Sequence, residues 1–146
     1  MKYLVVATPA ELKLPAAQDE ERVPIVTGVG GANVIKALQG LHLAADILNV
    51  GYCGSRAFPV GHVCEIGECR TYHPNCDFEE RTFKINGGDV LCLTSGDFVV
   101  GGELPHNSVV DMELAYIAAM GFKNLKSVKY VSDSLDYEQY TKEING

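Results

Sequence analysis

The chain has 146 residues, 47% of them hydrophobic and 21% charged, which is ordinary for a soluble globular protein, and we expect residues 1–146 to form one domain. Its formal net charge is −7 and it has no basic stripe, so we expect neither nucleic acid nor an anionic membrane surface as a partner. No apolar run reaches the length of a membrane span, and the run at 2–7 is too short for the core of a signal peptide.

The first half of the chain predicts three buried strands and one helix. Continuous apolar runs at 3–7 and 23–27 are typical of parallel strands, and residues 46–50 repeat the pattern. The glycine turn at 28–31 leads into a helix predicted over 32–43, on which apolar residues recur at helical spacing.

The second half begins with short β-prone runs over 62–83, where Gly67 is a turn signal. The further predicted elements are a strand over 90–94, a helix over 111–120, a strand over 126–132 and a short helix over 136–143. This order predicts an α/β fold with three layers, in which helices flank a largely parallel, mixed central sheet.

Small or polar residues follow four of the predicted strands, at 28–30, 51–54, 95–98 and 132–133. Ligands of open α/β sheets bind beyond the carboxyl ends of the strands, where glycine lets the backbone approach a ligand closely. Several such ends would together form a pocket, although any one glycine turn is explained equally well as a tight turn.

The helix predicted over 111–120 is apolar nearly all round, which indicates burial. Asp111 in its first turn is explained as a capping residue. Glu113 is harder to explain, because a buried carboxylate needs hydrogen-bond donors, and the two hydroxyls of a ribose would supply them. A solvated first-turn glutamate is the alternative.

The turn at 28–33 has the form G-x-G-x-x-N, which is close to a dinucleotide-binding fingerprint. Its third position is Asn33 rather than glycine, and the next strand carries Asn49 rather than an acid near its end. We therefore expect no dinucleotide cofactor.

The five cysteines are an odd number in a chain without an export signal, so we expect reduced thiols and a cytoplasmic location. One group within a single stretch could ligate zinc: Cys64, Cys69, His73 and Cys76. Its spacing lacks the paired C-x-x-C form, and Cys64 and Cys69 would fall on opposite faces of a continuous strand. We therefore expect no metal.

Seven segments share a pattern with one known family and follow one another in its order. They are T-P-A-E at 8–11, T-G-V-G-G-A-N at 27–33, N-V-G-Y-C-G-S at 49–55, V-G-H-V at 60–63 with Y-H at 72–73, S-G-D-F at 95–98, V-D-M-E at 110–113 and V-S-D at 131–133. Together they resemble the purine nucleoside phosphorylase-like superfamily, in particular methylthioadenosine/S-adenosylhomocysteine nucleosidase and futalosine hydrolase. The resemblance implies a phosphorylase/hydrolase-like fold.

The resemblance also implies roles by position. Glu113 would bind the ribose hydroxyls, Met112 would pack against the sugar and Phe98 would stack on the base. Asp133 would help to protonate the purine at N7, and Glu11 would orient or deprotonate the attacking water. The remaining substrate-binding positions would be Gly51, Tyr52, Cys53, Gly54 and Ser132. No cofactor is implied.

Water is the expected nucleophile rather than phosphate. Phosphorolytic relatives gather phosphate with arginines and a serine, whereas the matching positions here look like Asn49 and Tyr52. Arg56 is the one arginine near a glycine turn. We therefore expect hydrolysis of the N-glycosidic bond of a purine nucleoside of the methylthioadenosine, S-adenosylhomocysteine or futalosine type, with a phosphate-dependent phosphorylase as the alternative.

The chain also departs from the family pattern. The stretch 82–90 is too short for the usual helix-plus-strand insertion, we expect only a short final helix, and His62 replaces an acid. Pro9 and Leu12 leave the alignment of Glu11 open by one position. A homodimer is expected, because a partner chain could close an otherwise open pocket. A noncatalytic nucleoside-binding protein is the further alternative.

Overall fold

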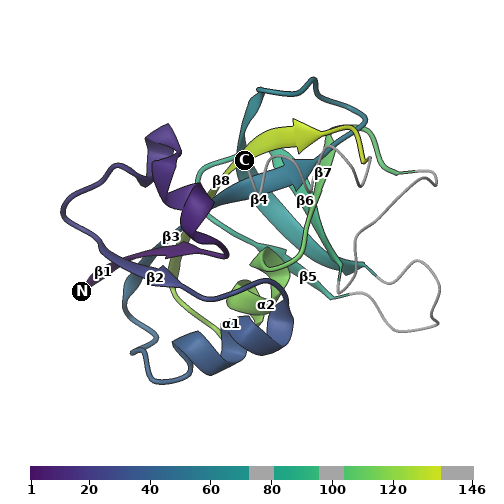
Figure 1. Cartoon of the computed structure of the whole chain (residues 1–146). Coiled ribbons are helices and arrows are strands. Elements are labelled where there is room, and N and C mark those ends of the chain that lie inside the picture. The colour runs from purple at the N-terminus through teal and green to yellow at the C-terminus, as the bar shows by residue number, and fades with distance from the viewer. Residues whose placement is uncertain (73–80, 96–103, 136–146) are drawn as a thin grey trace.

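A computed structural model describes residues 1–72, 81–95 and 104–135 (Figure 1). The first half contains β1 (Lys2–Val6), the 3₁₀ helices η1 (Pro9–Lys13) and η2 (Pro15–Ala17), β2 (Val23–Val26), α1 (Gly31–Leu38) and β3 (Asp46–Gly54). The second half contains β4 (Val63–Tyr72), β5 (Thr82–Lys84), β6 (Val90–Ser95), β7 (Ser108–Asp111), α2 (Leu114–Ala119) and β8 (Asn124–Asp133). The helix predicted over 136–143 lies outside the described residues.

One mixed sheet joins these strands. β2, β1, β3 and β8 are parallel neighbours in that order, and β4, β6 and β7 are parallel neighbours in a second group. The two groups meet antiparallel where β4 pairs with β8 and where Gly54 of β3 pairs with Val110 of β7. Strands β3, β8, β4, β6 and β7 therefore close into a ring of pairings, which brings the carboxyl ends of β3 and β7 together.

The mixed α/β sheet expected from the sequence is confirmed. The two α-helices α1 and α2 lie beside each other on one side of the sheet (Figure 1). The full set of flanking helices in the expected three-layer arrangement is not confirmed. Neither helix combines the length and the apolar character needed to cross a membrane, in the part of the chain that is described.

Both α-helices are shorter than predicted. α1 ends at Leu38, just before Gly40, instead of continuing to residue 43. The prediction of a helix beginning at residue 111 is wrong, because residues 108–111 form β7 and pair with β6. The β-branched pair Val109 and Val110 suits a buried strand as well as a helix, so the apolar run alone could not locate the boundary.

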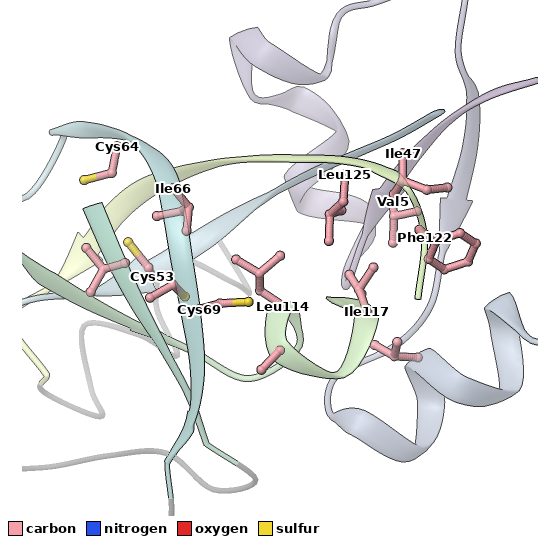
Figure 2. Close-up of a cluster of buried hydrophobic side chains, with 14 of the residues drawn as sticks. Val5, Ile47, Cys53, Cys64, Ile66, Cys69, Leu114, Ile117, Phe122 and Leu125 are labelled. Carbon is pink, nitrogen blue, oxygen red and sulfur yellow. The ribbon is translucent and has the colours of Figure 1, made fainter. Parts of the chain in front are cut away.

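A bulge in β4 corrects two further predictions. Gly67 does not end a strand: it lies within the ten-residue β4, where the register with β6 shifts between Ile66 and Glu68. The shift changes the alternation of side chains, so Cys64 and Cys69 both enter the same core and do not lie on opposite faces. Figure 2 shows both thiols among the buried side chains.

The core lies between the curved sheet and α2. Leu114 and Ile117 of α2 pack against strand residues such as Ile47 and Leu125 (Figure 2), and each fully buried leucine or isoleucine contributes about 1.5–3 kcal/mol. The cysteines in the described residues are free thiols and are buried, namely Cys53, Cys64, Cys69 and Cys92. This agrees with the expected reduced state.

Candidate functional site

Among the described residues, four carboxylates are buried at or just beyond strand ends. Glu11 follows β1, Asp111 ends β7, Glu113 precedes α2 and Asp133 ends β8, with relative exposures of 5%, 4%, 7% and 0%. Aspartate and glutamate are almost never buried unless they are paired. The partners of each therefore define what the site can do.

Glu11 is held against β3 by backbone donors. Its Oε1 accepts hydrogen bonds from the N–H groups of Ala7 and Thr8 at 2.8 and 2.9 Å, and its Oε2 accepts one from Tyr52 at 2.7 Å. A Cβ atom at Gly51 would lie only 2.7 Å from Oε2. Glycine at position 51 is thus what allows the carboxylate to approach the strand, and Glu11 is the buried acid of this turn.

Lys129 and Asp111 form an ion pair inside the protein. Their side chains are 1% and 0% exposed, and Lys129 Nζ lies 3.0 Å from Asp111 Oδ2. Burial lowers the pKa of Lys129, but the charge of Asp111 outweighs this effect and the net shift is upward. Burial likewise raises the pKa of Asp111, and Lys129 together with the hydroxyl of Thr94 outweighs it, so the net shift is downward. Both groups are therefore ionised at neutral pH.

Sequence reasoning missed Lys129. A lysine in an apolar strand reads as an exposed residue, yet this side chain is among the largest that are fully buried. One signal could have revealed it: Lys129 shares the alternation of Leu125 and Val131, whose side chains are buried. The pairing of Lys129 with Gly51 then brings the ammonium group next to Glu11.

Glu113 lies between β7 and α2, and its Oε2 accepts a hydrogen bond from the N–H of Gly30 at 2.9 Å. Burial raises its pKa to about 8, and the charge of Asp111 adds to this, while Lys129 and the Gly30 N–H oppose it. At neutral pH the group is mostly a neutral acid that can both donate and accept hydrogen bonds. Met112 beside it is partly buried.

Asp133 is fully buried at the end of β8. Its Oδ2 accepts a hydrogen bond from the Ser132 hydroxyl at 2.9 Å, and its Oδ1 accepts one from the Leu135 N–H at 2.8 Å. A Cβ atom at Gly54 would overlap the Leu135 side chain and would lie 2.7 Å from Asp133 Oδ1. Gly54 therefore leaves room for the carboxylate of Asp133, just as Gly51 leaves room for that of Glu11.

The buried acids are all placed around the carboxyl end of β3. Glu11 contacts it at Tyr52, Asp133 lies against Gly54, and the pairing of Gly54 with Val110 brings in the segment that carries Asp111 and Glu113. The side chain of Cys53 packs in the core, so only its backbone is available at the carboxyl end of β3. Phe98 lies outside the described residues.

Two groups considered for phosphate have other surroundings. Asn49 is buried and donates from Nδ2 to the Val5 carbonyl at 3.2 Å, while its Oδ1 accepts from the Ser127 hydroxyl at 2.8 Å. Arg56 is exposed. Within residues 1–72, 81–95 and 104–135, no group of three or more His, Cys, Asp or Glu side chains is arranged to hold a metal ion.

Comparison with known proteins places this geometry in a known fold. No family model and no curated protein matches the sequence. Solved structures do match: the MTA/SAH nucleosidase of Streptococcus pneumoniae in complex with 8-aminoadenine has a TM-score of 0.76 at 17% identity, over 99% of this chain and 92% of that chain.

Two further solved structures agree. The methylthioadenosine/S-adenosylhomocysteine nucleosidase of Neisseria meningitidis with methylthio-immucillin-A has a TM-score of 0.73 at 18% identity, over 98% of this chain and 91% of that chain. An MTAN of Chlamydia trachomatis bound to MTA has a TM-score of 0.72 at 18% identity, over 98% and 92%. The chain therefore has the fold of these nucleosidases, as the sequence resemblance implies.

Proposed function

We propose that this protein hydrolyses the N-glycosidic bond of a purine nucleoside, of the methylthioadenosine, S-adenosylhomocysteine or futalosine type, and releases the free base and the sugar. One observation carries the proposal: Glu11, Glu113 and Asp133 are all buried around the carboxyl end of β3. Solved proteins of the same fold are nucleosidases, and two of them hold MTA and methylthio-immucillin-A.

Asp133 is the proposed general acid. When the bond between the sugar C1′ and the purine breaks, its electrons pass to the base, and a proton delivered to N7 neutralises the developing charge. The Ser132 hydroxyl and the Leu135 N–H fix the orientation of the carboxyl group. Positioned proton transfer of this kind is worth about 10²- to 10⁴-fold in rate.

Glu113 is the proposed ligand of the ribose hydroxyls, with Met112 against the sugar. Its carboxyl group has one backbone donor at Gly30 and is otherwise in a dry environment. A diol offers two further donors, and hydrogen bonds to the charged form would favour ionisation of Glu113 on binding. Nucleoside affinity should therefore improve as the pH rises toward 8.

Glu11 is the proposed residue that orients or deprotonates the attacking water, and Lys129 is its cationic neighbour. Both lie over Gly51, where a side chain would exclude them. The water oxygen would bond to C1′ as the glycosidic bond breaks, and the released proton would pass to Glu11. Lys129 would offset the negative charge that the Glu11 carboxylate carries before it accepts this proton.

Hydrolysis is favoured over phosphorolysis by the partners of the candidate phosphate groups. Asn49 uses its side-chain amide within the sheet, and Arg56 is exposed. Lys129 is already paired with Asp111. A phosphate dianion beside Glu11 and Asp111 would meet two carboxylates. A phosphorylase is therefore the second candidate.

The test is a panel of methylthioadenosine, S-adenosylhomocysteine, futalosine, adenosine and inosine, with and without added phosphate. We expect the release of free base without phosphate, and a loss of about 10²- to 10⁴-fold in Glu11→Gln and Asp133→Asn. Glu65→Gln, a change at an exposed position of β4, is the matched control and should keep full activity.

Three results would overturn or change the proposal. Base release that requires phosphate and yields ribose 1-phosphate identifies a phosphorylase. Saturable nucleoside binding by calorimetry without turnover identifies a noncatalytic nucleoside-binding protein. No turnover and no binding by the folded protein with any compound of the panel removes the nucleoside proposal altogether.

We also propose that residues 1–146 act as one domain and that two copies form a homodimer that completes the pocket. Exposed apolar side chains of β2 and of the turn after it, Val23, Val26 and Val29, support association. Sedimentation equilibrium should give about twice the chain mass of 15.8 kDa. A mass of 15.8 kDa at micromolar concentration, with full activity, would contradict the dimer.

A further inference from the structure

The carboxylate of Asp111 connects the segment that carries Glu113 with the part of the site around Glu11. Asp111 Oδ2 accepts hydrogen bonds from the N–H of Leu114 at 2.8 Å and of Glu113 at 3.3 Å, at the start of α2. The same oxygen lies 3.0 Å from Lys129 Nζ. Asp111 therefore touches both the segment that carries Glu113 and the cation that lies beside Glu11.

Lys129 extends this connection to Glu11. A Cβ atom at Gly51 would lie 3.2 Å from Lys129 Nζ and 2.7 Å from Glu11 Oε2, so the two charged atoms are no more than about 6 Å apart. Charges at this separation in a buried site interact strongly. A shift of the Lys129 ammonium would therefore change the electrostatic surroundings of Glu11.

Thr94 holds the other oxygen of Asp111. Its hydroxyl donates to Asp111 Oδ1 at 2.5 Å and accepts a hydrogen bond from the Ala115 N–H at 2.9 Å. Thr94 is fully buried in β6, so β6, β7, α2 and β8 all meet at this carboxylate. With both oxygens engaged, Asp111 has a single orientation.

We propose that Asp111, held by Thr94, is a positioning residue for the proposed hydrolysis: it fixes Glu113 through the start of α2 and fixes Lys129 beside Glu11. The expected effect on the rate of hydrolysis rests on the proposed function. The expected effect on the titration of Glu113 rests on the geometry alone and can be measured without any turnover.

The pKa of Glu113 depends on this arrangement of charges, so its titration can be used to test the proposal. The charged groups that face it are Asp111 from β7, Lys129 from β8 and Glu11 from η1. Burial raises its pKa, and Asp111 is the next largest cause in the same direction. Loss of the Asp111 charge should therefore lower the pKa of Glu113, since Lys129 would then act without its counter-ion.

The experiment compares Asp111→Asn, Thr94→Val and Thr94→Ser with the unaltered chain. Carboxyl-carbon NMR with labelled glutamate follows the titration of Glu113, which Glu113→Gln assigns by loss of its signal. We expect Asp111→Asn to lower the midpoint by about one pH unit or more, Thr94→Val to lower it less, and Thr94→Ser to restore it. With a nucleoside that the protein cleaves, kcat/KM should fall at least about tenfold in Asp111→Asn, and the pH profile should move with the midpoint.

A purely structural role would give a different result. Thr94→Val, which keeps the charge of Asp111, would then lower only the thermal midpoint, while the titration of Glu113 and the pH profile of the folded protein would stay unchanged. If Asp111→Asn does not fold, the pair Thr94→Val and Thr94→Ser decides the question. If the unaltered chain cleaves no nucleoside, the proposed hydrolysis fails, whereas an unchanged Glu113 titration in the variants would overturn the positioning role.

Discussion

Glu113 is the residue whose charge the fold opposes most clearly. Its pKa rises from 4.5 to about 8, mainly because of burial and next because of the charge of Asp111. Between these two values the folded protein keeps a proton that the unfolded chain has released. The stability that depends on Glu113 is therefore present at low pH and is lost as the pH rises through this window.

Glu113→Gln should remove this pH dependence. The neutral amide carries no charge to bury, and its oxygen can still accept from the Gly30 N–H. We expect urea denaturation to show that the free energy of unfolding of the variant, compared with that of the unaltered chain, is about 4 kcal/mol more favourable near pH 8.5 than near pH 5. Glu65→Gln is the exposed control, and an equal effect of Glu113→Gln at both pH values would contradict a raised pKa.

The sequence could predict the burial of the acids but not the buried cation. Glu113 lies in a short motif next to an apolar run, and its expected burial is confirmed, while the roles expected for Glu113 and Asp133 stay predictions. Lys129 was not predictable from the run around it, because its partner Asp111 lies 18 positions away and meets it only through the closed sheet. A buried charge is stable only with such a partner.

The bulge of β4 depends on a close backbone contact between two glycines. Gly67 and Gly88 cross backbone to backbone, so a Cβ atom on Gly67 would overlap the carbonyl oxygen of Gly88. A Cβ atom on Gly88 would in turn overlap the carbonyl oxygen of Glu65. Because neither backbone can yield like a flexible side chain, the bulge requires glycine at both positions.

Gly67→Ala should therefore destabilise the fold by about 3 kcal/mol or more. Gly40→Ala is the matched control: a Cβ atom there meets nothing within 4 Å, and we expect a change of less than about 1 kcal/mol. Thermal melting of both variants checks this. Equal midpoints for the two variants would show that the crossing of Gly67 with Gly88 is not tight.

Hydrophobic pattern predicted the elements better than their boundaries. The predicted strands at 3–7, 23–27 and 90–94 match β1, β2 and β6 within a residue at each end. The predicted junction of β7 and α2 was wrong, because Val109 and Val110 are both buried and a run that is apolar on all sides has no distinguishing period. The bulge at Gly67 was read as a turn for the same lack of long-range information.

The overall arrangement of the sheet depends on pairings between strands that are far apart in the sequence, and a local hydrophobic pattern cannot predict such pairings. β3 neighbours β1, β7 and β8, so its carboxyl end is shared by segments from across the chain. The connection between β5 and β6 has only five residues, 85–89. Family resemblance, rather than periodicity, is what predicted this arrangement.

The proposed function requires that Glu113 and Asp133 line one cleft for a purine nucleoside. A crystal structure of the Asp133→Asn variant with methylthioadenosine would show this, since the variant should bind the nucleoside without cleaving it. We expect the ribose hydroxyls on Glu113 and the purine N7 next to residue 133. A nucleoside bound elsewhere, or one that touches only one of these two positions, would contradict it.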